Sequence, residues 1–267
     1  MSNRDLFAGG ILSRDSRTVA PKAELAEAVF KHTVGIGIPV RDGLVRATGT
    51  LVNIRGHLRI ATARHVVEAM YRGAEGEIAI SGYRLLQPYQ PTVSHAVRGD
   101  AEYFKVRQIQ LLQSLATKFK GEDCPFPDVA LIELEHTFEI GRYTECWGGV
   151  LTPPIHDVMA AIGYPAHYQD QCVCVIGDDP EVVVEHGIRL YQMQGLSRGT
   201  LVRARGASAA DHKSFGGMSG GGLWAYIPSL GWTYVGVVFF ESGNGRADVI
   251  YSTASNELTQ LLEPERD

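Results

Sequence analysis

The sequence predicts an all-β fold, and two observations carry that prediction. Short runs rich in β-branched residues follow one another at close intervals along most of the chain, with turn residues between them. The 267 residues also include 30 glycines, which suits a fold with many tight turns. We therefore expect a chain built mainly of short antiparallel strands.

The first half of the chain begins with residues 1–30, which we interpret as an N-terminal extension with a short helix over 23–30. A single helical turn is expected over 65–70, and a long loop over 86–103, where Pro88, Pro91 and Gly99 lie. The strands predicted in this half cover 33–40, 45–54, 58–62, 77–80, 104–113 and 129–134.

The second half reads as a further series of strands that ends in a helix. The predicted strands cover 157–163, 172–176, 181–185, 188–195, 199–204, 222–227, 233–241 and 248–252. A C-terminal helix is predicted over 256–262, because Leu258, Leu261 and Leu262 share one helical face. Ser255 is the N-cap candidate for that helix.

Composition excludes several classes of protein. Apolar residues make up 45 % of the chain and charged residues 21 %, which is ordinary for a globular protein. The net charge is −5 and no basic cluster is present, so we expect no nucleic-acid partner. No apolar run approaches membrane-spanning length, and the N-terminal stretch has no apolar block typical of a signal peptide. We therefore expect a cytoplasmic protein without a membrane partner.

The four cysteines fit the same compartment. Cys172 and Cys174 are two residues apart and would share one face of a strand. That spacing does not suggest a disulfide framework. A zinc site using these two with His167 or His186 stays open, but the C-x-C spacing is not a strong zinc pattern, so we expect no metal.

One serine lies in a glycine-rich segment just before an apolar run. Residues 217–221 read G-M-S-G-G, with Ser219 at the centre, and match the pattern G-x-S-x-G. Glycines let the backbone approach a ligand closely and leave N–H groups free to bind an oxyanion. A simple turn is the alternative interpretation of this segment alone.

A serine nucleophile needs a base and a group that orients the base. None of the nine histidines follows Ser219, which excludes the Ser-Asp-His order of the α/β-hydrolases. His65 follows a predicted hairpin, and Asp128 opens the apolar run 129–134. Asp100 and Asp123 compete with Asp128, but neither directly opens an apolar strand.

These three segments resemble the trypsin/chymotrypsin-like serine peptidases. His65 in T-A-R-H-V, Asp128 in D-V-A-L-I and Ser219 in G-M-S-G-G-G occur in that family's order, at intervals of 63 and 91 residues. The segments A-I-G-Y-P at 161–165 and G-V-V at 236–238 are most similar to the bacterial branches, including the glutamyl-endopeptidase-like and HtrA-like peptidases.

The resemblance implies a fold of two antiparallel six-stranded β-barrels, with the active site in the cleft between them and a C-terminal helix. The peptidase domain would cover 31–262, with barrel one at about 31–140 and barrel two at about 145–254.

The resemblance also implies a serine endopeptidase that needs no cofactor and acts on a protein or peptide substrate. Ser219 would attack the carbonyl, His65 would act as general base, and Asp128 would orient the imidazole. The backbone N–H groups of Gly217 and Ser219 would hold the oxyanion. Two alternatives stay open: a non-catalytic peptide-binding or scaffold module, and an esterase with the same triad. A regulatory protein partner is not identified.

The specificity pocket is defined only by position in the chain. Lys213, before the serine, is a candidate for its floor. Phe239, Phe240 and Glu241, which follow Gly236, are candidates for its wall. A cationic Lys213 would favour acidic substrates and Glu241 would oppose them, so the primary specificity stays open.

Overall fold

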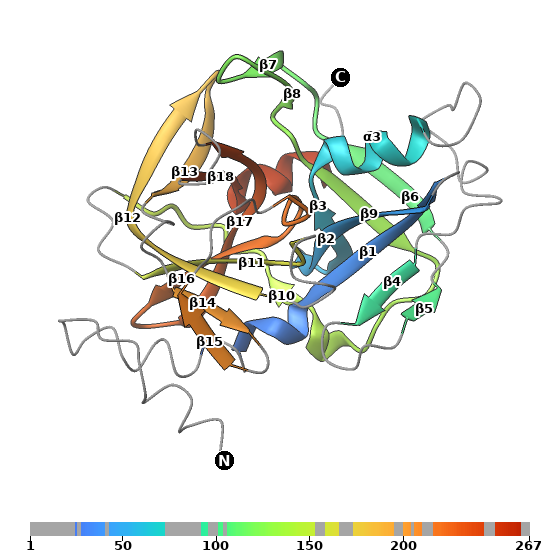
Figure 1. Ribbon diagram of the computed structural model, residues 1–267, viewed down its shortest axis with the longest axis horizontal. Helices are drawn as coiled ribbons and strands as arrows, with labels where there is room; N and C mark the ends of the chain where they lie inside the picture. Colours follow the sequence, from blue (N-terminus) through green and yellow to red (C-terminus); the bar gives the residue numbers. More distant parts are fainter. Residues whose placement is uncertain are drawn as a thin grey trace.

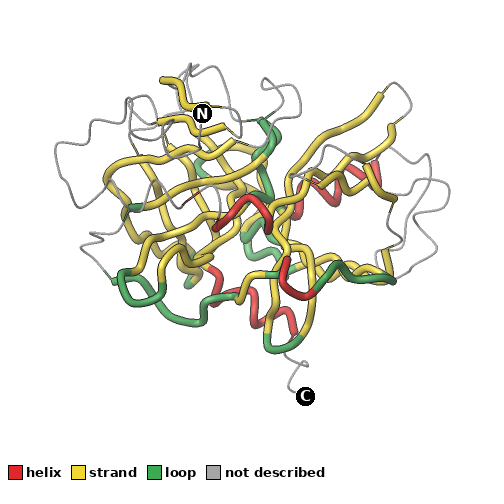
Figure 2. Tube along the Cα trace, turned by 90° about the horizontal axis from the view of Figure 1, so that it is seen from below, coloured by secondary structure: helices red, strands yellow, loops and turns green. Residues whose placement is uncertain are grey.

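The computed structural model describes residues 25, 28–40, 43–72, 92–95, 101–103, 106–152, 158–165, 173–194, 200–203, 206–209, 216–242 and 249–262. Most of this chain is β-strand (Figure 2), arranged as two large sheets and one two-stranded sheet. All strand pairs except one are antiparallel in this part of the chain, which confirms the predicted all-β class. The two sheets meet where β11 lies beside β1 and β2 (Figure 1).

The first sheet contains the strand that leads to His65. Its strands, in pairing order, are β5 (Ala101–Tyr103), β4 (Thr92–His95), β1 (Thr33–Val40), β2 (Gly43–Ile54), β3 (His57–Thr62), β9 (Ala130–Leu134) and β6 (Val106–Leu111). The short β10 (Thr144–Glu145) adds to β2 in parallel.

This first sheet is curled but not closed. Among its described strands no pairing joins the two ends, β5 and β6, so it forms a half-barrel. The prediction of a closed six-stranded first barrel is therefore wrong for the described strands. The predicted loop over 86–103 was also wrong in part, because β4 and β5 extend the sheet from there. The predicted strand 77–80 lies outside the described residues.

The second sheet closes on itself. Its strands, in pairing order, are β11 (Met159–Gly163), β16 (Gly222–Ile227), β17 (Gly231–Ser242), β18 (Val249–Ala254), β13 (Ile188–Gln194), β12 (Val173–Glu185), β14 (Thr200–Arg203) and β15 (Gly206–Ala209). Because β11 pairs with both β16 and β12, six strands form a ring, and β14 and β15 extend from β12.

The strand β12 runs through a segment where the sequence predicts two strands, 172–176 and 181–185. A register shift between Asp178 and Glu181 accommodates Pro180, which has no N–H to donate to the ladder. The bulge lets one long strand pair with β11 and β14 at one end and with β13 at the other.

A hairpin that the sequence analysis missed joins the two halves. It consists of β7 (Ala116–Phe119) and β8 (Glu122–Phe126), connected by Lys120 and Gly121, both with positive φ. The ring of Phe119 contacts Phe239 and Tyr251 of the second sheet, each at 5.1 Å between centroids. Figure 1 shows the hairpin beside the connected ends of β12 and β13, where Lys120 Nζ lies 3.3 Å from Glu185 Oε2.

The helices are short. Those whose bounds the described chain gives are η2 (Phe30–His32), α3 (Arg64–Arg72), η4 (Ile140–Arg142) and η7 (Ser255–Leu262), of which α3 is an α-helix and the others are 3-10 helices. Residues 25, 28 and 29, inside the helix predicted over 23–30, are also α-helical. The segment predicted as a C-terminal helix, 256–262, lies in the 3-10 helix η7 and does not form the α-helix that the spacing of its leucines indicates. Ser255 does not act as its N-cap, because its hydroxyl donates a 2.6 Å hydrogen bond to the carbonyl of Trp147. Within the described ranges, no helix is long and apolar enough to cross a membrane.

The chain before β1 contributes to the core. Leu25, Val29 and Phe30 are buried in a cluster that also contains residues of both sheets, among them Val52 and Trp224. Residues 25, 29 and 30 of the predicted N-terminal extension therefore stabilise the contact between the two halves by burying apolar surface.

His32 in the same region makes stability depend on pH. Its ring is buried, stacks on Trp224 at 5.5 Å, and shares a 2.8 Å hydrogen bond with the carbonyl of Arg142. Burial lowers the pKa of His32 from 6.5 to about 4, although the hydrogen bond works in the opposite direction. Between those two pH values the unfolded chain binds more protons, so the free energy of unfolding falls as pH drops from about 6.5 to 4.

We expect this residue to contribute a loss of about 3 kcal/mol across that range. Urea unfolding of the wild type and of His32→Phe at pH 7 and pH 4 measures it. The phenylalanine variant keeps an aromatic ring against Trp224 and should show the smaller loss on acidification. Equal losses in the two proteins would contradict the assignment.

Candidate active site

His65 and Asp128 are brought together by the pairing of β3 with β9. Thr62, the last residue of β3, pairs with Ala130, the first of β9. His65 follows β3 at the start of α3, and Asp128 precedes β9. Because β3 and β9 are antiparallel, both residues lie at the same end of this strand pair. The N–H of His65 donates to Asp128 Oδ1 at 2.8 Å, and His65 Nδ1 donates to Asp128 Oδ2.

This double contact fixes the histidine ring. Asp128 is fully buried, whereas 40 % of the His65 side chain is exposed. An ionised carboxylate only accepts hydrogen bonds, so Nδ1 carries the proton and the neutral ring keeps a free lone pair on Nε2. Burial disfavours the charged imidazole, but the hydrogen bond to Asp128 and the charges of Asp128 and Glu68 outweigh it and raise the pKa of His65 above 6.5.

Cys124 is a third hydrogen-bond donor to the same carboxylate. Its thiol lies in β8 and donates to Asp128 Oδ2 across 3.5 Å. Burial, together with the charge of Asp128, raises the pKa of Cys124 to about 12. The thiol therefore stays protonated at neutral pH, as a donor rather than a nucleophile. The sequence analysis missed this role, and the only signal for it was the spacing of four residues before Asp128.

Ser219 lies in the glycine loop that precedes β16. Gly217 and Gly220 have φ values of +96° and +88°, in the region that favours glycine. The N–H of Gly220 donates to the carbonyl of Val238 at 2.7 Å, and the N–H of Gly221 to that of Met218 at 2.7 Å. These bonds shape the loop around the half-exposed Ser219.

The loop packs directly against the sheet that carries His65. A Cβ atom built on Gly220 would lie 2.1 Å from the hydroxyl of Thr62, which is three residues before His65. Ser219 is therefore near the His65 end of β3, although no hydrogen bond joins its hydroxyl to the His65 ring in the described part of the chain. In the same part, neither Gly217 nor Ser219 donates its N–H to a backbone acceptor.

Similarity to solved structures agrees with this arrangement. A thermostable serine protease, AL20, from an extremophilic microorganism superimposes with a TM-score of 0.51, at 14 % identity over 86 % of this chain and 94 % of its own. The chain has the trypsin-like serine protease fold.

Two further structures match this trypsin-like chain with lower TM-scores. The protease Anisep from Arthrobacter nicotinovorans gives 0.49, at 13 % identity over 84 % of this chain and 90 % of its own. An inactive form of the protease Rv3671c from M. tuberculosis H37Rv gives 0.48, at 17 % identity over 95 % of this chain and 97 % of its own. No family model and no curated protein sequence matches the chain.

The predicted specificity residues are only partly placed in this trypsin-like fold. Lys213 lies outside the described residues, as do the side chains of Phe240 and Glu241, whose backbones belong to β17. Phe239 is 2 % exposed, and its ring packs against Phe119 and Phe126 of the β7–β8 hairpin. The roles of these residues in specificity stay predictions.

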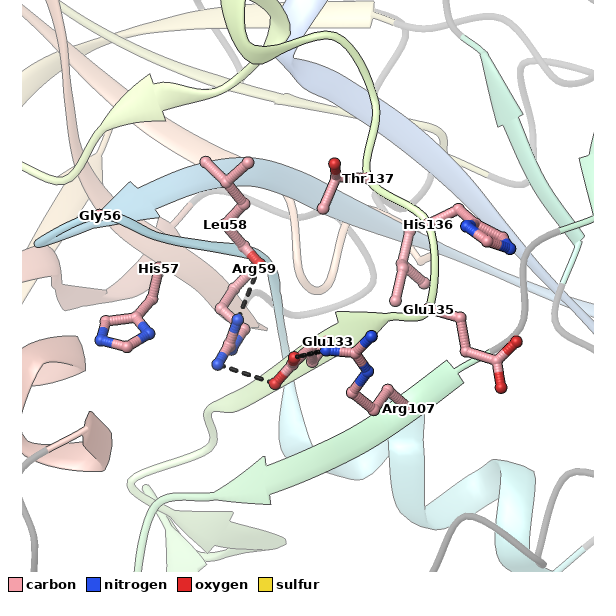
Figure 3. Close-up of a pocket in the computed structure, with 10 residues that line it drawn as sticks. Gly56, His57, Leu58, Arg59, Arg107, Glu133, Glu135, His136 and Thr137 are labelled. Carbon is pink, nitrogen blue, oxygen red and sulfur yellow. Dashed lines mark hydrogen bonds and ion pairs between the residues drawn. The ribbon is translucent and has the colours of Figure 1, made fainter.

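A cavity of about 540 Å³ lies at the opposite end of β3 from His65 (Figure 3). Arg59 and Arg107 both point at Glu133 there, with nitrogen–oxygen distances of 2.8 and 3.1 Å. The two arginines are thus engaged by an internal carboxylate, and the cavity is separate from the candidate active site. Of the residues placed in the structure, no three from His, Cys, Asp and Glu form a group that could hold a metal ion.

Proposed function

We propose that the protein is a serine endopeptidase that cleaves peptide bonds through an acyl-enzyme. Ser219 Oγ attacks the carbonyl carbon, and His65 Nε2 takes the hydroxyl proton and returns it to the leaving amine. Asp128 holds the protonated Nδ1 and stabilises the imidazolium that forms. Water then attacks the acyl-enzyme with His65 again as base, which releases the acid and restores Ser219.

The two hydrogen bonds between His65 and Asp128 are the observation that carries the proposal. A buried carboxylate that accepts hydrogen bonds from both the N–H and the ring of one histidine fixes the tautomer needed for a general base. A residue with only a structural role would not need a 40 % exposed ring held in this way.

The glycine loop supports the role of an oxyanion site. The N–H groups of Gly217 and Ser219 have no backbone acceptor in the described structure and lie on either side of Met218. Each such donor lowers the barrier by roughly 3–4 kcal/mol when it is aimed at the developing charge. Hydrogen bonds between nucleophile and base often tighten only when substrate binds. The mechanism therefore does not require a hydrogen bond between Ser219 and His65 before that step.

The protease-like fold favours a protein or peptide substrate, and the same machinery would also cleave activated esters. The thiols of Cys124 and Cys146, neither of which forms a disulfide, support a reducing, cytoplasmic environment. A scaffold protein on this fold would bind peptides without an activated serine.

A fluorophosphonate probe tests the proposal, since it reacts only with an activated serine. We expect labelling of the full-length wild type at Ser219, located by peptide mass spectrometry. The labelling rate should rise with pH through an apparent pKa above 6.5, because the raised pKa of His65 keeps it protonated to higher pH.

Absence of labelling at every pH between 5 and 9 would instead favour the scaffold interpretation. Comparison of a fluorescent casein with a p-nitrophenyl ester then separates a peptidase from an esterase, because an esterase would hydrolyse the ester alone.

A further inference from the structure

We propose that Thr48 is a positioning residue for the oxyanion-binding loop, an inference that rests on the proposed hydrolase function. Thr48 lies in β2, in the first sheet, and is fully buried. It belongs to the half of the molecule opposite to the one that contains Ser219. Nothing in its local sequence, a threonine in a predicted strand, distinguishes it from a structural residue.

Four hydrogen bonds converge on this one residue. Its hydroxyl donates to the carbonyl of Gly217 at 2.7 Å and accepts from the N–H of Tyr164 at 2.9 Å. Its N–H donates to the carbonyl of Ser219 at 3.2 Å, and its carbonyl accepts from the hydroxyl of Thr62 at 2.8 Å. A hydroxyl has one donor and two acceptor sites, so both of its bonds form at once.

The two bonds to the loop hold the residues that supply the oxyanion donors. Thr48 binds the carbonyls of Gly217 and Ser219, on either side of Met218. This restricts rotation about the backbone of the same two residues whose N–H groups would face the oxyanion. A loop rich in glycine has many accessible conformations, so external contacts are needed to keep such donors aligned before the reaction.

The packing leaves little freedom at this contact. A Cβ atom on Gly163 would lie 2.9 Å from the Thr48 hydroxyl, and one on Gly220 would lie 2.1 Å from the Thr48 carbonyl. Glycine at both positions thus lets the loop and the end of β11 approach β2 closely. The Thr48 hydroxyl lies where β2, the loop and the end of β11 meet, and it hydrogen-bonds to both of the latter.

Thr50 provides a matched control. It lies two residues further along β2, on the same face of the strand, and is also fully buried. Its hydroxyl has no hydrogen-bond partner among the described residues. The change from threonine to valine therefore removes two hydrogen bonds at position 48 and none at position 50, with the same change in shape.

The test compares the full-length wild type with Thr48→Val, Thr48→Ser and Thr50→Val. The readouts are the second-order rate of fluorophosphonate labelling and the kcat and KM for a p-nitrophenyl ester. Thr48→Val should lower the labelling rate and kcat by roughly 10- to 100-fold, with KM changed by less than about threefold. Thr48→Ser, which keeps the hydroxyl, and Thr50→Val should stay within about threefold of the wild type.

The outcomes separate this inference from the proposed function. If the wild type is not labelled, the proposed hydrolase function fails, and this inference fails with it. If the wild type is labelled and Thr48→Val is labelled equally fast, or Thr48→Ser is as slow as Thr48→Val, the positioning role alone is overturned. If circular dichroism shows that Thr48→Val does not fold, Thr48→Cys replaces it in the comparison. Because a thiol is a weaker donor than a hydroxyl, Thr48→Cys should be labelled more slowly than Thr48→Ser. Equal labelling rates would overturn the positioning role.

Discussion

Replacing Ser219 with alanine is expected to lower kcat about a million-fold. The change removes the only atom that the mechanism uses as a nucleophile, while the His65–Asp128 pair and the glycine loop remain in place. The residual rate would come from water attacking a substrate held beside the oxyanion donors. Active-site titration with the fluorophosphonate and steady-state hydrolysis of an ester measure the loss.

Ser252→Ala is the matched control for this experiment. Ser252 lies in β18, is fully buried, and its hydroxyl has no hydrogen-bond partner within the described structure. Its replacement removes no hydrogen bond and should leave kcat within about twofold of the wild type. If Ser219→Ala retained more than about a thousandth of the activity, another group would have to be the nucleophile.

Asp128→Asn is expected to lower kcat about 10⁴-fold, with little change in KM. The carboxylate accepts hydrogen bonds from the N–H of His65, from its Nδ1 and from the Cys124 thiol. An amide has one oxygen and one NH₂ group, so it cannot accept all three. With NH₂ at the Oδ2 position, Nδ1 must become an acceptor, and the proton moves to Nε2, where it blocks the general base.

Asp123→Asn is the control for charge and position. Asp123 competes with Asp128 in the sequence, but its side chain is 90 % exposed and lies 3.6 Å from Lys118 Nζ. Its neutralisation should leave kcat within about twofold of the wild type.

The acid limb of the pH–rate profile provides a second readout for Asp128→Asn. Loss of the Asp128 charge should lower the pKa of His65 and shift this limb to lower pH. An unchanged limb would argue that Asp128 does not face the imidazole.

The sequence predicted well those features that depend on local pattern. His65 after a hairpin and Asp128 before an apolar run could be identified because strand alternation and turn residues are local signals. The pairing of β3 with β9 then brings these two residues together. The proximity of Ser219 was inferred from the order of the motifs, since its segment lies more than 90 residues away.

The features that were missed depend on contacts between distant segments. Thr48 and Cys124 occupy ordinary strand positions, and only the folded chain shows which polar groups they meet. The β7–β8 hairpin was hidden by the polar run before Cys124 and by Pro125, both unfavourable for a strand. The prediction of a C-terminal helix rested on the helical spacing of its leucines. The hydroxyl of Ser255, the predicted N-cap, donates instead to the carbonyl of Trp147.

The β7–β8 hairpin has a consequence for protein engineering. Phe119 belongs in sequence to the N-terminal half, but its ring contacts Phe239 and Tyr251 of the other half. A chimaera that exchanged the halves of two homologous chains at residue 140 would separate this aromatic group from its partners. Grafting residues 116–126 together with the C-terminal half would preserve the group, but Cys124 and its acceptor Asp128 would then come from different parents. Both contacts therefore have to be kept when recombination sites are chosen.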